Sequence, residues 1–116
     1  MLAKQYRLRR RKDFARLHKR GQIAHSSSFS IKYAPNQLDN SRAAVVISTK
    51  IDKRAVIRNR TRRRFYAALQ DMWPQIKPGH DLVILTRHPS INLKSDKLKT
   101  ELQSTLNRAG LIEDSS

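Results

Sequence analysis

The clearest pattern along the chain is a run from Lys50 to Trp73 that contains no glycine and no proline before Pro74. Arginine and alanine are good helix formers, so this run predicts a helix over about residues 55–73. At 100° per residue, one helix face collects Thr61, Phe65, Ala68, Leu69 and Met72. The opposite face collects Asn59, Arg60 and Arg63, with Arg64 at its edge and Arg58 and Arg62 nearer the apolar border. This helix is therefore expected to pack through its C-terminal half and to present cations from its N-terminal half.

Four segments show the patterns of β-strands. Two continuous apolar runs, Ala43–Ser48 and Leu82–Thr86, predict strands buried on both faces. A third strand is predicted around residues 28–33, where Phe29, Ile31 and Tyr33 alternate with Ser28, Ser30 and Lys32. The apolar set is expected in the core, and the polar set then forms a surface suited to sugar and phosphate. A short strand near residues 22–25 completes the set.

Two further helices are predicted at the two ends of the chain. The first covers about Arg11–Arg20, with Phe14 and Leu17 as its small apolar face, and Gly21 is expected to end it as the C′ residue, a position where glycine is usually left-handed. The second carries a leucine at every fourth position and is closed by Gly110. Residues 1–10 and 111–116 show no clear period and are expected to be mobile.

The predicted order of elements is therefore α-β-β-β-α-β-α within a single domain covering residues 1–116. This order indicates an α+β or α/β two-layer sandwich, in which helices pack on a central mixed sheet. The helix over residues 55–73 connects two strands that are expected to be neighbours. If those strands are parallel, the general rule predicts a right-handed crossover.

The net charge of the chain bears on its function rather than on its fold. The net charge is +16, and residues 1–64 hold 19 lysines and arginines against three aspartates, so the first half carries the whole excess. Such a balance favours an anionic partner. The absence of cysteine excludes disulfides and thiolate metal sites, and no apolar run has the length of a signal peptide or a membrane span. We therefore expect a cytoplasmic protein without membrane association.

Six arginines between residues 54 and 64 make the predicted central helix costly on its own. Like-charged neighbours at helical spacing destabilise it by about 1–2 kcal/mol in total, and cations near a helix N-terminus oppose the helix dipole. A bound polyanion would reverse both penalties, and the planar arginine fork suits bidentate phosphate contacts. The alternative, a solvated basic face, is disfavoured by the number and clustering of these side chains.

Three motifs together resemble one known family. The block Ala55–Arg63, which follows a buried strand, is similar to the signature helix of the bacterial ribonuclease P protein subunit. Arg11–Phe14, with Gly21 seven residues after Phe14, resembles the first helix of that family. The segment Gly79–Ile84, followed by Arg87 and Pro89, resembles its late strand. The resemblance covers about residues 7–108 in the same order and at similar spacing.

The resemblance implies a ribosomal-protein-like fold with a left-handed crossover, and an accessory subunit that is inactive alone and monomeric when free. A catalytic RNA would use Mg²⁺ to remove the 5′ leader of precursor tRNA, while the protein holds no catalytic residue and no metal. Binding of the catalytic RNA would fall to Arg54, Arg58, Asn59, Arg60, Arg62, Arg63 and Arg64. A cleft between the first helix and the sheet would hold the leader through Phe14, His18, Ser30 and Lys32, next to a basic arm formed by Arg9, Arg10, Arg11 and Lys12.

The residues alone leave some of these roles open. A phenylalanine three residues before Leu17 is more often a core residue than an exposed one, whereas the resemblance favours a partly exposed Phe14 that stacks on a base. His18 stands where many family members have a second aromatic residue, and Lys32 stands where some have tyrosine. Tyr66 occupies a position often held by arginine, and residues 52–54 form a more charged approach to the helix than the common glycine-asparagine pair.

Three alternative functions are compatible with the composition. A structural protein of ribosomal RNA would share the charge and the fold class. A DNA-binding helix module is disfavoured by the buried strands, which do not suit a helix-turn-helix. A protein ribonuclease site would need two histidines and a lysine brought together, and nothing in the order of the four histidines selects a pair or a metal-binding spacing.

Overall fold

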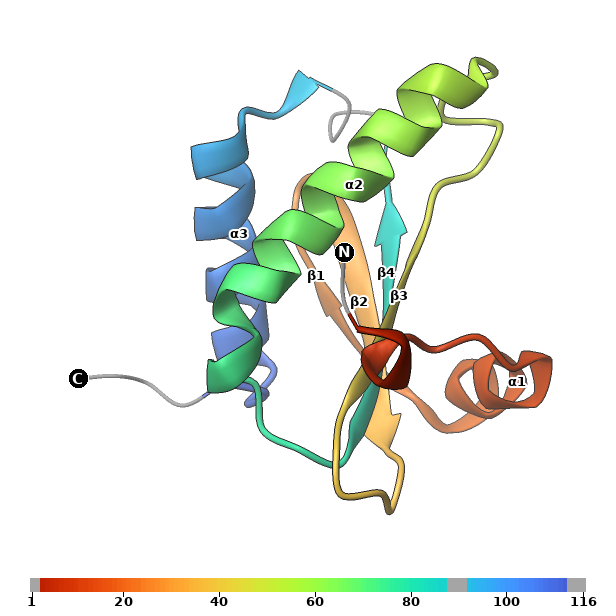
Figure 1. The fold of residues 1–116 in the computed structure, drawn as a ribbon, viewed down its shortest axis with the longest axis vertical. Helices are drawn as coiled ribbons and strands as arrows, with labels where there is room; N and C mark the ends of the chain where they lie inside the picture. Colours follow the sequence, from red (N-terminus) through yellow and green to blue (C-terminus); the bar gives the residue numbers. More distant parts are fainter. Residues whose placement is uncertain (1–2, 88–91, 113–116) are drawn as a thin grey trace.

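The structure is a computed structural model that describes residues 3–87 and 92–112 (Figure 1). It contains three α-helices and four strands among these residues, in the order expected from the sequence. The helices are α1 (Arg11–Arg20), α2 (Ala55–Met72) and α3 (Ser95–Arg108). The strands are β1 (Gln22–His25), β2 (Phe29–Pro35), β3 (Arg42–Val46) and β4 (His80–Thr86). Two short 3-10 helices, η1 (Lys4–Tyr6) and η2 (Trp73–Gln75), precede α1 and follow α2.

The four strands form one mixed sheet in the order β1-β2-β4-β3. β2 pairs antiparallel with both β1 and β4, and Tyr33 lies opposite Leu82 in the second pair. β3 and β4 are neighbours connected through α2, as the sequence predicted, and the structure shows that they are parallel. The hand of this connection, on which the general rule and the family resemblance differ, stays a prediction.

The two faces of the sheet are covered by different helices, with α2 and α3 on one side and α1 on the other (Figure 1). On the first side, Phe29 of β2 and Phe65 of α2 pack edge to face with ring centroids 5.5 Å apart, and both are fully buried. The leucines of α3 at positions 98, 102 and 106 complete this core. On the second side, Leu17 of α1 packs over a smaller cluster that includes Ala44 and Val83. This division places the polar side of β2 under α1.

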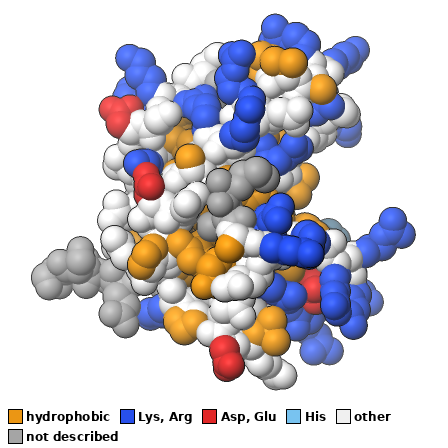
Figure 2. Space-filling model, viewed as in Figure 1, with side chains coloured by type: hydrophobic (Ala, Val, Ile, Leu, Met, Phe, Trp, Pro, Cys, Tyr) orange, Lys and Arg blue, Asp and Glu red, His pale blue; other side chains and the backbone are white. Residues whose placement is uncertain are grey.

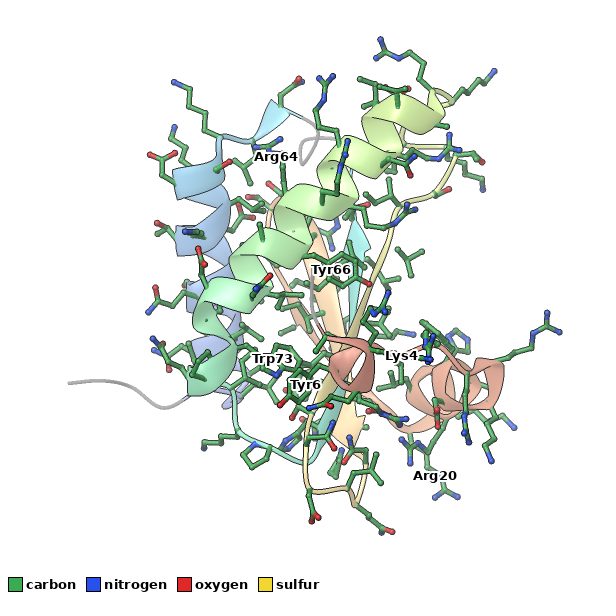
Figure 3. The ribbon with its side chains drawn as sticks, viewed as in Figure 1. Lys4, Tyr6, Arg20, Arg64, Tyr66 and Trp73 are labelled. Carbon is green, nitrogen blue, oxygen red and sulfur yellow. The ribbon has the colours of Figure 1, made fainter. Side chains whose placement is uncertain are left out.

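The predicted faces of α2 are confirmed. Its small and apolar face is buried along its length, with each of Thr61, Phe65, Ala68, Leu69 and Met72 at most 7% exposed. Tyr66 is also buried, and its hydroxyl oxygen accepts a hydrogen bond from the backbone N–H of Val45 at 3.3 Å. Because β3 is an edge strand, this contact satisfies a donor that has no neighbouring strand on that side. Tyr66 thereby anchors α2 to the sheet (Figure 3).

Both chain ends, for which the sequence predicted mobile segments, contact the rest of the fold in the residues that the structure describes. Leu8 is 3% exposed, and its N–H donates to the carbonyl of Ala43 at 2.9 Å, so the N-terminal segment lies along the free edge of β3. Tyr6 also contacts Trp73, with ring centroids 5.5 Å apart (Figure 3). Near the other end, Leu111 is 1% exposed, and its carbonyl accepts from the N–H of Lys77 at 2.8 Å. Residues 1–2 and 113–116 lie outside the described residues.

Two local expectations also need correction. Gly21 ends α1 with φ near −74°, so it does not use the left-handed conformation. Glycine is needed there for space, because a Cβ would lie 2.4 Å from the carbonyl oxygen of Leu17. β3 ends at Val46, which is 40% exposed, and so this strand is not buried on both faces at its C-terminal end. The sequence also predicts a loop over residues 89–93, of which residues 89–91 lie outside the described residues.

Candidate nucleic-acid interface

The N-terminal half of α2 presents the cations that the sequence predicted. Asn59, Arg60 and Arg63 are exposed, and Arg58, Arg62 and Arg64 are half-buried. Figure 2 shows Lys and Arg side chains gathered over the end of the molecule where α2 begins, and again over α1. The buried C-terminal half of α2 holds this exposed half rigidly against the sheet.

Several of these side chains are oriented by local contacts. Arg54 forms an ion pair with Asp52 at 2.8 Å, and its guanidinium and backbone N–H, which both donate hydrogen bonds, lower the pKa of Asp52 to about 2. Arg58 donates to the backbone carbonyls of Asp52 and Lys53 at 2.9 and 2.8 Å. Asn59 accepts from Arg62 at 2.9 Å. These contacts fix the start of the helix, and the Arg54 side chain remains 72% exposed despite its ion pair.

Two arginines of the cluster are left without a protein partner. In the described part of the chain, Arg60 and Arg63 form no side-chain hydrogen bond or ion pair. Since neighbouring arginines also repel one another, this surface has a large unmet capacity for anions. The planar guanidinium groups suit bidentate hydrogen bonds to phosphates.

A second surface lies on the other side of the sheet, where α1 and the sheet enclose a hollow of about 420 Å³. Its floor is apolar and includes Val46, Val83 and Leu85. Phe14 lies at its wall and is half-buried, so it is neither a core residue nor a fully exposed one. The lining residues are Arg11, Phe14, Ala15, Leu17, His18, Lys32, Val46, Val83 and Leu85. An apolar floor with an aromatic wall suits a base, and a cationic rim suits its phosphate.

The structure brings together three of the four predicted leader-binding residues. Phe14, His18 and Lys32 line the hollow, and His18 Nδ1 lies 3.1 Å from Lys32 Nζ at its rim. Ser30 shares the sheet face of Lys32 but does not line the hollow. It is 5% exposed, and its hydroxyl accepts from Arg87 at 2.6 Å and lies 3.1 Å from His25 Nδ1. The Ser30 hydroxyl is thus already occupied within the protein.

The basic arm predicted at residues 9–12 is exposed throughout. Arg11 lines the hollow, and the carbonyl of Arg10 accepts the first hydrogen bonds of α1 from Asp13 and Phe14. The arm therefore leads into the start of α1, and its Arg11 lines the hollow.

Sequence reasoning missed the group that fixes α1 in place, the buried carboxylate of Asp81 at the start of β4. Asp81 is fully buried and accepts hydrogen bonds from Arg16 of α1 at 2.6 Å, from Arg42 of β3 at 2.9 and 2.8 Å, and from Asn36 at 2.9 Å. The hydrogen bonds from Arg42 to Asp81, opposed by burial, raise the pKa of Arg42. The available signal was an aspartate at the edge of the apolar run Leu82–Thr86, where an unpaired charge would be costly.

No group of three or more His, Cys, Asp or Glu side chains that could hold a metal ion occurs within residues 3–87 and 92–112. No helix in these two ranges combines the length and the apolar character that crossing a membrane requires. His25 and His80 lie outside the lining of the hollow, and His88 is outside the described residues.

Comparison with known proteins identifies the family of this chain. The ribonuclease P family profile matches residues 2–110. The ribonuclease P protein component of Cyanothece sp. PCC 7425 is 33% identical over 97% of this chain and 98% of its own, and that of Synechococcus elongatus is 37% identical over 92% of each. The RNase P protein from Thermotoga maritima superimposes with a TM-score of 0.81 at 26% identity, covering 93% of this chain and 98% of its own. The protein from Staphylococcus aureus, at 23% identity and a TM-score of 0.84 over 93% of this chain and 98% of its own, shares the fold. The chain therefore belongs to the ribonuclease P family, as a protein component of that enzyme.

Proposed function

We propose that this subunit binds the catalytic RNA of ribonuclease P through the N-terminal half of α2 and holds the 5′ leader of precursor tRNA between α1 and the sheet. The observation that carries the proposal is the separation of two cationic surfaces on opposite sides of one sheet. One surface is a convex row of arginines, and the other is a hollow with an apolar floor. A folded RNA suits the first, and a single strand suits the second.

The contribution of α2 is electrostatic. Arg58, Arg60, Arg62 and Arg63, with Arg54 and Arg64 at the flanks, offer about six to eight phosphate contacts when the nearby lysines are included. Neutralising that many phosphates releases bound counterions, which gives a log–log slope of binding against salt of about −4 to −7. Asn59 keeps Arg62 in position for this contact.

The contribution of the hollow is stacking. A base placed against Phe14 would cover the half-exposed ring and the apolar floor, which is worth about 1–3 kcal/mol per base. Lys32 and His18 at the rim, and Arg11 at the start of α1, then face the sugar and phosphate. This arrangement recognises single-stranded RNA without fixing one sequence.

The chemical step belongs to the RNA in this proposal. We expect the protein alone to be inactive and monomeric, and to act in the cytoplasm. Mg²⁺ held by the catalytic RNA would supply the activation of water and the charge stabilisation that hydrolysis needs. The matches reported above are ribonuclease P proteins, which disfavours a purely ribosomal role. Cleavage of precursor tRNA by the purified protein, free of RNA, would overturn this division of labour.

The assembly role is tested with the double variant Arg58→Ala, Arg62→Ala. We expect weaker binding to the cognate catalytic RNA and a shallower salt slope, because two phosphate contacts are lost. The matched control is Lys77→Ala, Lys97→Ala, which removes two exposed cations outside α2. Equal losses in both variants, or a wild-type slope shallower than about −2, would contradict a specific arginine interface.

The leader role is tested with Phe14→Ala. We expect unchanged binding to the catalytic RNA and at least a tenfold weaker affinity of the reconstituted enzyme for precursor tRNA, with little change for mature tRNA. Ile23→Ala is the matched control, since Ile23 is 44% exposed on β1 and does not line the hollow. An equal loss of affinity for precursor and mature tRNA would reject the leader role of Phe14.

A further inference from the structure

A second cationic site lies in a groove of about 310 Å³ between α2 and the start of α3. The groove is lined by Arg60, Arg63, Arg64, Ala67, Ala68, Ser95 and Lys99. Figure 3 shows Arg64 in the space between α2 and the first turn of α3. The sequence motif accounts for the arginines of α2, but it gives no role to Ser95 and Lys99 of α3.

The charged residues that line the groove are positive. Four of the seven lining residues are cations, and within the described chain no carboxylate is among the lining residues. Lys99 forms an ion pair with Asp71, in which the two side chains remain 48% and 59% exposed. A pair so accessible to water contributes little to stability, which leaves the ammonium of Lys99 available to a stronger anion.

The shape of the groove admits a nucleic-acid backbone. Ala67 and Ala68 line it beside the arginines, and their short side chains keep it open between the two helices. Its volume is about ten times that of a water molecule in the liquid (about 30 Å³), which is enough for a phosphodiester and its first ordered waters. The hydroxyl of Ser95 adds a neutral donor at one end of the groove.

The position of the groove indicates which RNA can reach it. Arg60 and Arg63 belong both to the groove and to the exposed face of α2, so any RNA that covers α2 also passes over the groove. The hollow beside Phe14 lies on the opposite side of the sheet. The leader therefore does not compete for the groove.

We infer that the groove between α2 and α3 binds a phosphodiester of the catalytic RNA, and that Lys99 and Ser95 extend the interface from α2 onto α3. This inference rests on the proposed function, since it assumes that the catalytic RNA lies against α2. It adds an electrostatic contact from a helix that otherwise supplies core leucines. It also predicts that Asp71 weakens RNA binding, because its carboxylate competes with the phosphate for Lys99.

The test compares Lys99→Ala with Lys97→Ala in the full-length protein. Both variants remove one exposed lysine from the first turns of α3, but only Lys99 lines the groove. The affinity for the cognate catalytic RNA is measured by filter binding between 50 and 300 mM monovalent salt at fixed Mg²⁺. We expect Lys99→Ala to weaken binding about three- to tenfold and to reduce the salt slope by about 1, while Lys97→Ala changes affinity less than twofold.

Asp71→Asn separates a binding role of Lys99 from a purely structural one. If Lys99 meets a phosphate, this variant binds the RNA as well as the wild type or more tightly, because a competing carboxylate is gone. If the Lys99–Asp71 pair only holds α2 and α3 together, Asp71→Asn weakens binding as much as Lys99→Ala does, and the inference is overturned. Circular dichroism and thermal melting confirm that the variants remain folded.

The remaining outcomes are also decisive. Equal affinities of Lys99→Ala and Lys97→Ala, with strong wild-type binding, would reject the groove and leave the proposed function intact. Absence of wild-type binding to the catalytic RNA would instead reject the proposed function itself. A rise in melting temperature with inorganic phosphate that Lys99→Ala abolishes, without any effect on RNA binding, would assign the groove to free anions and overturn its assignment to RNA.

Discussion

Removing the buried carboxylate of Asp81 is the sharpest test of how the fold holds α1 in place. Asp81 accepts two hydrogen bonds from Arg42, one from Arg16 and one from Asn36, and all four are 2.6 to 2.9 Å long. Arg42 also forms an ion pair with Asp13 at 3.4 Å. Asp81→Ala therefore leaves two guanidinium groups without their main partner.

The expected loss follows from the burial of those groups. Breaking a buried ion pair by removing one partner costs about 3–5 kcal/mol, because the other charge stays desolvated. The side chains of Arg16 and Arg42 retain 37% and 19% of their exposure, so water partly replaces the lost acceptor. We therefore expect about 3 kcal/mol, at the lower end of that range. At about 4 °C per kcal/mol for a chain of this size, the melting temperature falls by about 12 °C.

The free energy of unfolding is measured by urea titration with circular dichroism. Asp39→Ala is the matched control, because it removes one exposed carboxylate and makes the same change in net charge. Arg16→Met isolates the link between α1 and β4 and should cost about 1–2 kcal/mol, since it removes one charged hydrogen bond and leaves the Arg42 pair intact. If Asp81→Ala and Asp39→Ala differ by less than about 0.5 kcal/mol, Asp81 does not hold α1 in place.

Three further predictions concern single contacts. Burial acts to raise the pKa of Glu101, but hydrogen bonds from the β1–β2 loop outweigh burial, so the pKa is lower in the folded protein than in the unfolded chain. The stability that Glu101 contributes is therefore fully present above about pH 4.3, the pKa of an unfolded glutamate, and is lost as pH falls through the lower pKa of the folded protein. Urea titrations should therefore show the stability gap between the wild type and Glu101→Gln closing as pH falls from 7 to below 4. Gly21→Ala should destabilise the protein by about 1–2 kcal/mol, because the added Cβ collides with the carbonyl of Leu17, and a melting temperature equal to that of the wild type would contradict this. Tyr66→Phe should cost about 1 kcal/mol by leaving the N–H of Val45 unpaired, and hydrogen exchange at that amide should accelerate.

Periodic patterns predicted the helices and strands well, because each pattern depends on one helix or one strand alone. The period of α2 placed Phe65 and Leu69 in the core and Arg60 and Arg63 in solvent, and the structure agrees. The leucine repeat of α3 is confirmed in the same way. In these helices one face meets one partner surface, so spacing alone carries the information.

Contacts between distant segments were not predictable from any local pattern. Leu8 and Leu111 are isolated apolar residues near the chain ends, and their burial depends on the edge of β3 and on the turn after α2. The position of Ser30 on the polar side of β2 was correctly predicted. However, its hydroxyl is bonded to Arg87, more than fifty residues away, and no spacing rule indicated that.

The two proposed RNA surfaces would hold two RNA strands close to each other. The molecule measures 36 × 36 × 25 Å, so strands bound on opposite faces of its sheet lie only a few Debye lengths apart at physiological salt, where that length is about 8 Å. Two polyanions brought so close repel each other unless fixed cations lie between them, and the chain places its entire excess of +16 in residues 1–64, which supply the cations of both surfaces.

Those cations destabilise the free protein, since the like charges along α2 alone cost about 1–2 kcal/mol. Bound RNA removes that penalty and stabilises the folded state in proportion to its concentration over its dissociation constant. The crowded arginines therefore lower the stability of the isolated subunit but not that of the RNA complex. Neutralising the cluster should stabilise the free protein and weaken the complex, two opposite effects of one substitution that a merely solvated basic face would not produce.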